Sequence, residues 1–218
     1  MLKWQIQINL ICVFKKKLVS LQAEKIDMKE YNDKDIEKAV ATLRNGGIIL
    51  YPTDTVWGIG CDATNFEAVA RIYSLKRRAD SKSMLVLTAD KAMTEIYAEI
   101  SETALQLLNG KPYKPLTVIY PNAKNLAENL VSADGSIGIR ISNEPFSQTL
   151  CRELGRPIVS TSANLSGHPT AKTFSQIEEI IRQGVDYIVE YRRDDEREQQ
   201  PSSIIKVNTD GTTTVIRL

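Results

Sequence analysis

The alternation of apolar and polar residues becomes regular from Asn32 onward and predicts helices and strands in turn. Between Asn32 and Gly47, apolar residues recur every three or four positions, which is typical of an amphipathic helix. Asn32 or Asp33 can cap its start, and the pair Gly46-Gly47 suits its end. The apolar run IILY comes next and predicts a short buried strand that ends at Pro52. The residues expected on the inner face of the helix are Ile36, Ala39, Val40 and Leu43.

The same pattern predicts a second helix over TNFEAVARIYSLK, residues 64–76. Thr64 and Glu67 have the spacing of a capping box. The residues expected on its inner face are Val69, Ile72 and Tyr73. Further helices are predicted at residues 145–154 and 173–183 and as a pair around residues 89–108. Further strands are predicted at residues 84–88, 116–120, 136–141, 157–160, 187–190, 202–207 and 213–218.

Strands alternate with helices for most of the length, and the last three strands have no helix between them. This order predicts an α/β fold, a single domain with a twisted, mixed β-sheet flanked by helices, over residues 28–218. Residues 1–27 hold a weak apolar stretch followed by three lysines, whereas a secretory signal has its charge before the apolar segment. We interpret residues 1–27 as an N-terminal extension or a misassigned start.

Composition narrows the possible functions. With 28 basic and 27 acidic residues the chain is nearly neutral, which argues against a protein that coats nucleic acid but allows a local basic cleft. The sequence has no apolar run long enough to cross a bilayer. Cys12, Cys61 and Cys151 lie far apart without metal-ligand spacing, which predicts a reduced, cytoplasmic protein with its thiols in the core. A single histidine, His168, excludes a histidine-rich metal site.

Polar side chains gather where several apolar strands end. The turn YPTDTVWG, residues 51–58, carries Thr53, Asp54 and Thr55. These side chains either bond the local backbone or face a ligand. Because ligands in open α/β sheets bind outside strand ends, we expect such polar places to converge on one site.

A basic cluster follows at the end of the second predicted helix. Lys76, Arg77, Arg78 and Lys82 lie close together and leave two interpretations open. Basic residues at a helix C-terminus are favoured by the helix dipole and are often solvated. The planar fork of arginine and the point charge of lysine also suit a polyphosphate.

The strand SIGIRIS, residues 136–142, has one polar face. By alternation, the residues on that face are Ser136, Gly138, Arg140 and Ser142. Arg140 can bind a carboxylate bidentately from there, or it can point to solvent from a half-exposed strand.

The remaining polar strand ends lie in the C-terminal third of the chain. Ser160 and Ser162 share one side of the strand end PIVSTSANLSG, and Asn164 follows in its turn. Hydroxyl and amide side chains compete with regular backbone pairing, so their density here favours a binding site. Ser202 and Arg217 lie in the last two predicted strands.

The segments YPTDTVWGIGCDATN, KRR, SIGIRIS, STSANLSG and PSSIIKV follow one another in an order that resembles the YrdC/Sua5 family. Members of that family are threonylcarbamoyl-AMP synthases, which begin synthesis of the N6-threonylcarbamoyl modification of adenosine 37 (t6A) in tRNA. The resemblance runs from about Gly46 to the C-terminus and is to the short, single-domain form. It implies a YrdC-like α/β domain whose twisted sheet surrounds a concave, positively charged cavity.

The resemblance also implies a reaction. L-threonine, bicarbonate or carbon dioxide, and ATP would condense to threonylcarbamoyl-AMP and pyrophosphate, so the chain would be a nucleotidyltransferase that uses Mg²⁺ with its ATP. The product would pass to the t6A transferase complex in the cytoplasm. RNA or tRNA binding is left open, as is the choice between a monomer and a homodimer.

The resemblance assigns roles to the residues that match the family's motifs. Lys76 and Arg78 match its K-x-R pair and would be the catalytic residues, bound to the ATP phosphates. The residues implied in nucleotide binding are Lys76, Arg78, Ser136, Ser162, Asn164 and Arg217. Those implied in threonine binding are Thr55, Arg140, Ser160 and Ser202, with Arg140 on the carboxylate. Neither metal ligands nor a general base are assigned.

Two other functions stay open from the sequence. An RNA-binding module would grip the RNA backbone in its basic cleft, and its affinity would fall steeply with salt. A YciO-like relative would share the fold without this synthase activity, although the complete motif STSANLSG, including Asn164, favours the synthase. The polar connection at residues 191–203 is either a mobile loop near the site or a solvated one.

Overall fold

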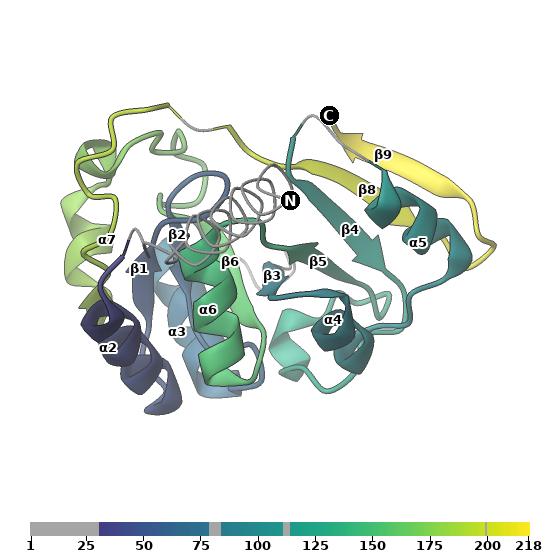
Figure 1. The fold of residues 1–218 in the computed structure, drawn as a ribbon, viewed down its shortest axis with the longest axis horizontal. Helices are drawn as coiled ribbons and strands as arrows, with labels where there is room; N and C mark the ends of the chain where they lie inside the picture. The colour runs from purple at the N-terminus through teal and green to yellow at the C-terminus, as the bar shows by residue number, and fades with distance from the viewer. Residues whose placement is uncertain (1–30, 79–83, 111–113, 199) are drawn as a thin grey trace, which may run out of the picture. The chain divides into compact units, whose positions relative to one another are not determined.

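A mixed β-sheet carries the fold of this computed structural model, which describes residues 31–78, 84–110, 114–198 and 200–218. Within these ranges, nine strands follow the order β7-β1-β2-β6-β3-β5-β4-β8-β9 (Figure 1). The strands are β1 (Ile49–Tyr51), β2 (Gly58–Gly60), β3 (Leu85–Thr88), β4 (Leu116–Tyr120), β5 (Ile137–Ile141), β6 (Ile158–Ser162), β7 (Tyr187–Ile188), β8 (Ser203–Val207) and β9 (Thr213–Arg217). The expectation for residues 1–27 lies outside the described residues.

Helices flank this sheet, and residues 33–218 form one compact unit. The helices are α2 (Asp33–Arg44), α3 (Phe66–Lys76), α4 (Lys91–Tyr97), α5 (Glu102–Asn109), α6 (Pro145–Leu154) and α7 (Glu179–Gln183), with the 3-10 turns η1 (Glu128–Leu130) and η2 (Phe174–Gln176). α2 and α6 pack side by side (Figure 1). Among the helices that the structure describes, none is long and apolar enough to cross a membrane.

Both strand directions occur in the sheet. β3 and β5 run parallel, as do β4 and β8, and β1 and β7. The other pairs are antiparallel, including the hairpin of β8 and β9 at the edge of the sheet (Figure 1). The predicted single α/β domain with a mixed sheet is confirmed.

The first two predicted helices form with the inner faces that the sequence indicates. In α2, the predicted inner-face residues are all buried. In α3, Val69, Ile72 and Tyr73 are buried in a cluster that also holds Val86 of β3 and Val159 of β6. The predicted capping box is wrong, however. Asn65 rather than Thr64 caps α3, and its Oδ1 accepts from the Ala68 backbone N at 2.9 Å.

Two further elements differ from the prediction. The helix predicted at residues 173–183 is divided into η2 and α7, because Ile177 leaves the helical conformation and buries its side chain in the core. β2 was not predicted, since GIG is too short to show a strand pattern. It lies between β1 and β6, where a Cβ on Gly60 would come within 2.7 Å of the Tyr51 ring and 2.6 Å of the Val159 oxygen. Only glycine lets the neighbouring strands approach this closely.

The two cysteines in the described ranges are core residues, as predicted. Cys61 and Cys151 are both buried and unpaired. Burial raises the pKa of the Cys61 thiol well above its usual value and that of Cys151 to about 12, so both remain uncharged near neutral pH. Cys12 lies outside the described residues.

Candidate active site

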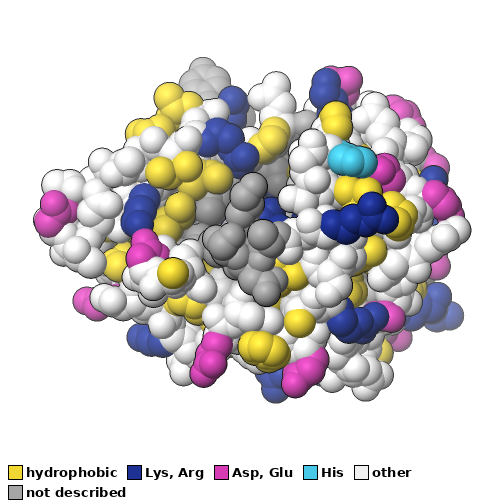
Figure 2. All heavy atoms as spheres, turned by 180° about the vertical axis from the view of Figure 1, so that it is seen from behind, with side chains coloured by type: hydrophobic (Ala, Val, Ile, Leu, Met, Phe, Trp, Pro, Cys, Tyr) yellow, Lys and Arg dark blue, Asp and Glu magenta, His cyan; other side chains and the backbone are white. Residues whose placement is uncertain are grey.

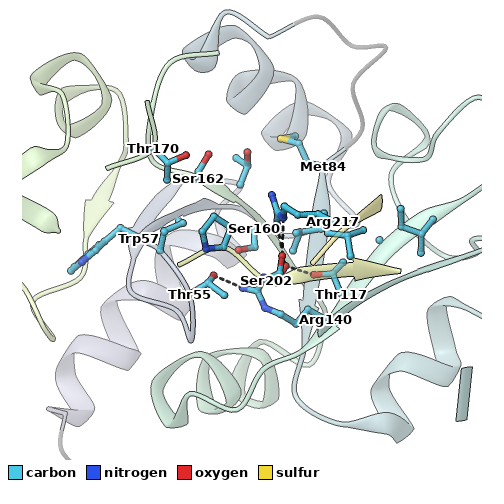
Figure 3. Close-up of a pocket in the computed structure, with 18 of the residues that line it drawn as sticks. Thr55, Trp57, Met84, Thr117, Arg140, Ser160, Ser162, Thr170, Ser202 and Arg217 are labelled. Carbon is cyan, nitrogen blue, oxygen red and sulfur yellow. Dashed lines mark hydrogen bonds between the residues drawn. The ribbon is translucent and has the colours of Figure 1, made fainter. Parts of the chain in front are cut away.

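A cavity of about 280 Å³ opens between strands that lie far apart in the sequence. It is lined by residues of β2, β3, β4, β5, β6, β8 and β9 and of the turn before β2. Seven of the ten residues predicted for the site line it, and Figure 3 shows most of them around one space. They are Thr55, Arg78, Arg140, Ser160, Ser162, Ser202 and Arg217.

The cavity is basic. Arg78, Arg140 and Arg217 line it, and no Asp or Glu is among the described residues that do. Burial lowers the pKa of Arg78, and burial followed by the like charge of Arg140 lowers the pKa of Arg217. On the face seen in Figure 2, acidic side chains lie mostly near the edge, whereas Lys and Arg also lie towards its middle. Three guanidinium groups without a lining carboxylate suit an anionic ligand.

Arg140 is fixed by the turn between β1 and β2. Its side chain is 3% exposed, and its Nε lies 3.0 Å from Oδ1 of Asp54, an ion pair without the alignment of a hydrogen bond. Its Nη2 donates to Oγ1 of Thr55 at 3.1 Å (Figure 3). β5 therefore points this arginine into the cavity, as strand alternation predicts, and a buried carboxylate compensates its charge.

Ser202, directly before β8, connects β9 with β4 through its hydrogen bonds. Arg217 donates from Nε to the Ser202 carbonyl oxygen at 2.8 Å, and its Nη2 lies 3.4 Å from Oγ of Ser202. The same Oγ lies 2.9 Å from Oγ1 of Thr117 in β4 (Figure 3). Thr117, which also lines the cavity, is not among the residues predicted for the site.

Lys76 lies beside the cavity rather than in its lining. It is 1% exposed, and its ammonium donates to the main-chain oxygens of Ser162 and Asn164. Burial, followed by the like charge of Arg78, lowers the pKa of Lys76 to about 8. Arg77 adopts a left-handed conformation, with φ of 50°, at the end of α3. The K-x-R segment thus divides: Arg78 reaches the cavity, and Lys76 holds the end of β6.

Two more predicted residues also lie outside the cavity lining. Asn164 is buried, and its Nδ2 donates to the main-chain oxygens of Leu165 at 2.9 Å and His168 at 2.8 Å. Ser136 is buried as well, and its Oγ donates to Oδ1 of Asp134 at 2.6 Å. The nucleotide-binding roles of these residues stay predictions.

The Sua5/YciO/YrdC family model, whose description reads "Telomere recombination", matches residues 41–218. The chain belongs to the Sua5/YciO/YrdC family. A relative named Threonylcarbamoyl-AMP synthase from Photobacterium profundum is 33% identical over 159 residues, which cover 72% of this chain and 86% of the relative. The family resemblance read from the motifs is confirmed.

Two solved structures share the YrdC-like fold. Escherichia coli YciO is 27% identical, with a TM-score of 0.75 over 85% of this chain and 89% of that one. P. abyssi Sua5, in a complex with L-threonine, is 24% identical, with a TM-score of 0.73 over 84% of this chain. This chain spans about half the length of that Sua5, covering 53% of it.

The polar connection after β7 packs beside the family's PTDT turn. Arg192 donates from Nη1 to the Thr53 carbonyl oxygen at 3.1 Å, and its Nε pairs with Asp195 at 3.1 Å. Arg197 also pairs with Asp195, at 2.8 Å. The described part of this connection therefore lies next to the turn that carries Thr55, and its mobility stays a prediction.

The described residues offer no protein cage for a metal ion. Within the described ranges, no three His, Cys, Asp or Glu side chains are grouped to hold a metal. The cavity lining supplies hydroxyl groups and arginines instead. Mg²⁺ commonly binds through one or two carboxylates together with substrate phosphates. These residues therefore do not fit a resident Mg²⁺ site.

Proposed function

We propose that this chain is an L-threonylcarbamoyladenylate synthase. It would condense L-threonine, bicarbonate or carbon dioxide, and ATP to threonylcarbamoyl-AMP and pyrophosphate, the first step of t6A formation. The observation that carries the proposal is one cavity lined both by three arginines and by the hydroxyl groups of β6 and of Ser202, which directly precedes β8. The named synthase relative, 86% of which is covered, supports the proposal. Because the proposed reaction transfers AMP from ATP, the chain would be a nucleotidyltransferase.

The wall formed by β5 and the 51–58 turn suits the amino acid. Arg140 presents a guanidinium whose orientation is set by Asp54 and Thr55. A guanidinium in a fixed orientation binds a carboxylate with two parallel hydrogen bonds. Ser160 and Ser202 line the same space and supply neutral donors and acceptors for the remaining groups of threonine.

The opposite wall suits the nucleotide. Arg78 and Ser162 line it, and Lys76 lies directly behind Ser162. The threonine amine would add to carbon dioxide to give a carbamate and a proton. A carbamate oxygen would then attack the α-phosphorus, with pyrophosphate as the leaving group. Such a displacement depends on positioning and charge neutralisation, which arginines supply without a titrating histidine.

Mg²⁺ would enter this reaction as the counter-ion of ATP. The described lining holds no carboxylate that could keep the ion by itself. When bound, the ion would neutralise phosphate charge, so we assign none of the described residues to it. The acceptor of the product would be the t6A transferase complex in the cytoplasm, which agrees with the unpaired thiols of Cys61 and Cys151.

The experiment is a pyrophosphate assay with purified protein, ATP, Mg²⁺ and bicarbonate, to which each of the twenty amino acids is added singly. We expect release with L-threonine and a matching amount of threonylcarbamoyl-AMP by mass spectrometry. Omission of bicarbonate should abolish both products. Release without an amino acid, or no release with any, contradicts the proposal. The second outcome favours a YciO-like function, since the fold is equally close to YciO.

A further inference from the structure

The hydroxyl groups of Thr53 and Thr55 form a row of hydrogen bonds in which each donor and acceptor is fixed. Oγ1 of Thr53 donates its only proton to the Val56 carbonyl oxygen at 2.9 Å, because a carbonyl can only accept. Oγ1 of Thr53 and Oγ1 of Thr55 lie 2.9 Å apart. Since the Thr53 proton is already used, Thr55 must be the donor in this contact. Thr53 also accepts from the backbone N of Thr55 at 3.0 Å, which holds the two residues in register.

The direction of these hydrogen bonds determines whether Thr55 presents a donor or an acceptor to the cavity. Arg140 donates to Oγ1 of Thr55 at 3.1 Å and, as a guanidinium, can only donate. The hydroxyl of Thr55 therefore gives its proton to Thr53 and one lone pair to Arg140. What remains towards the cavity that Thr55 lines is the second lone pair, which can only accept. Figure 3 shows Thr55 and Arg140 side by side at the cavity wall.

These hydrogen-bonded side chains are buried, so water does not compete with their hydrogen bonds and reverse the direction of donation. Thr53 is 2% exposed, Thr55 4% and Arg140 3%. A buried acceptor that meets no donor is unfavourable, which makes such a group a strong discriminator between ligands. The cavity wall thus presents donors from Arg140 next to a single acceptor from Thr55. This pairing is complementary to a molecule that carries a carboxylate close to an N–H or O–H group.

We propose that Thr53, which does not line the cavity, is a positioning residue that makes Thr55 a hydrogen-bond acceptor for an N–H or O–H of the substrate amino acid. The inference rests on the proposed function and deepens it. Without the Thr53 oxygen, the Thr55 proton is released to turn towards the cavity. Thr55 then presents a donor where the substrate also presents one.

The test compares Thr53→Val with Thr53→Ser. Valine has the shape of threonine without its hydroxyl group, whereas serine keeps the hydroxyl. For Thr53→Val we expect about a tenfold rise in KM for L-threonine, on the scale of one hydrogen bond to a buried group, with KM for ATP within about twofold of wild type. Thr53→Ser should restore the wild-type KM for L-threonine. A residue that only maintained the fold would shift both KM values together.

A second arm identifies the donor on the substrate. L-2-aminobutyrate is threonine without its side-chain hydroxyl. If Thr55 accepts from that hydroxyl, wild type prefers threonine and Thr53→Val loses most of the preference. If it accepts from the amine, Thr53→Val weakens both amino acids by the same factor. Either result supports the proposal. An unchanged KM for L-threonine in folded Thr53→Val, or equal rises in both KM values, overturns it.

Two controls keep the outcome decisive. Thr53→Cys fills the same space with a weak acceptor and replaces the valine variant if that variant does not melt cooperatively. Calorimetric binding of L-threonine to wild type and variants repeats the comparison without catalysis. If wild type binds L-threonine but forms no adenylate, the proposed function is rejected. The ratio of the Kd for L-threonine of Thr53→Val to that of wild type then decides this inference in place of the KM values. Wild type that does not bind L-threonine overturns both.

Discussion

The two walls of the cavity differ in what their polar side chains contact. On the wall of β5 and the 51–58 turn, Arg140 already faces the cavity, held by Asp54 and Thr55. On the wall of α3 and the end of β6, Lys76 and Asn164 instead contact main-chain oxygens. The first wall is ready for a ligand before it arrives. The second wall keeps its turn in shape, because Lys76 and the Nδ2 of Asn164 donate to main-chain oxygens there.

Burial of charge accounts for the difference. Arg140 keeps its charge in the interior because Asp54, whose side chain is 8% exposed, lies against it. Lys76 has only carbonyl oxygens as its described partners, and burial accordingly lowers its pKa to about 8. The preorganised ion pair fixes the orientation of Arg140 towards the cavity, whereas Lys76 orders the main chain at the end of β6. The first wall is thus suited to selecting its ligand, and Lys76 contributes to the second by holding its turn.

The substitution Asp54→Asn should have the largest effect, because it removes the ion pair that holds Arg140 in the first wall. It leaves the Arg140 charge buried and uncompensated, and breaking a buried pair in this way costs about 3–5 kcal/mol. We expect a loss of this size in the free energy of unfolding, measured by urea titration at neutral pH. The matched control is Glu95→Gln, which breaks the exposed pair of Glu95 with Lys91 at 3.6 Å. That change should cost about 0.5 kcal/mol or less. Equal losses for both variants would mean that Asp54 does not compensate Arg140.

The substitution Arg78→Ala tests the charge that the second wall presents to the cavity. We expect threonine-dependent pyrophosphate release to fall about 100-fold, the effect of losing one preorganised electrostatic donor. Arg77→Ala is the control, because Arg77 is exposed and does not line the cavity. It should leave the rate within about twofold, as surface substitutions usually do. Near wild-type release by folded Arg78→Ala would remove Arg78 from the phosphate site.

The arrangement of the first wall could largely be predicted from the sequence. Period-two alternation placed Arg140 on the polar face of its strand, and the residue does reach the cavity. The turn signals placed Thr55 beside a strand end. The partner of Arg140 was not predicted, because Asp54 and Arg140 are distant in the chain and meet only when β1 and β5 share the sheet. The direction of the Thr53 hydroxyl chain equally depends on main-chain geometry that residue spacing does not encode.

On the second wall, the sequence motif predicts which residues are involved but not which of them reach the cavity. The K-x-R pattern groups Lys76 with Arg78, but it does not show that Arg77 takes a left-handed conformation at the end of α3. This conformation turns the main chain after Lys76. Lys76 contacts the main-chain oxygens of Ser162 and Asn164 at the end of β6, while Arg78 reaches the cavity. Such a contact joins residues far apart in the sequence and becomes visible only in three dimensions. The capping of α3 by Asn65 rather than Thr64 has a related cause, since Oγ1 of Thr64 donates to Asp62 instead.

The pH dependence of the free energy of unfolding tests whether the Lys76 ammonium is buried with a lowered pKa. The pKa of Lys76 in the folded protein is about 8, below its ordinary value of 10.5. At pH values between these two, the folded protein therefore binds fewer protons than the unfolded chain. The free energy of unfolding therefore rises with pH in this interval, by about 2 kcal/mol from roughly pH 7.5 to 9.5. Lys76→Met should lack this rise, so the contribution is the difference between the two pH curves from urea titrations.

An exposed lysine provides the control for that difference. Lys91→Met should follow the wild-type pH curve, because Lys91 is about half exposed and its pair with Glu95 lies on the surface. Parallel curves for wild type and Lys76→Met would show that Lys76 has an ordinary pKa. In that case the ammonium is less buried in solution than the contacts with Ser162 and Asn164 indicate.

The substitution Ser162→Ala should give the smallest effect and tests whether the second wall binds nucleotide at all. The main-chain oxygen of Ser162 holds Lys76, while the residue lines the cavity, so alanine keeps the first contact and removes only the hydroxyl. A neutral hydrogen bond contributes about 1 kcal/mol, so we expect KM for ATP to rise about fivefold with KM for L-threonine unchanged. Ser166→Ala, in the same turn but outside the described lining, should leave both values unchanged. An ATP titration of Ser162→Ala that matches wild type would show that this hydroxyl does not contact the nucleotide. The wall would then act on ATP through Arg78 and the shape of its turn.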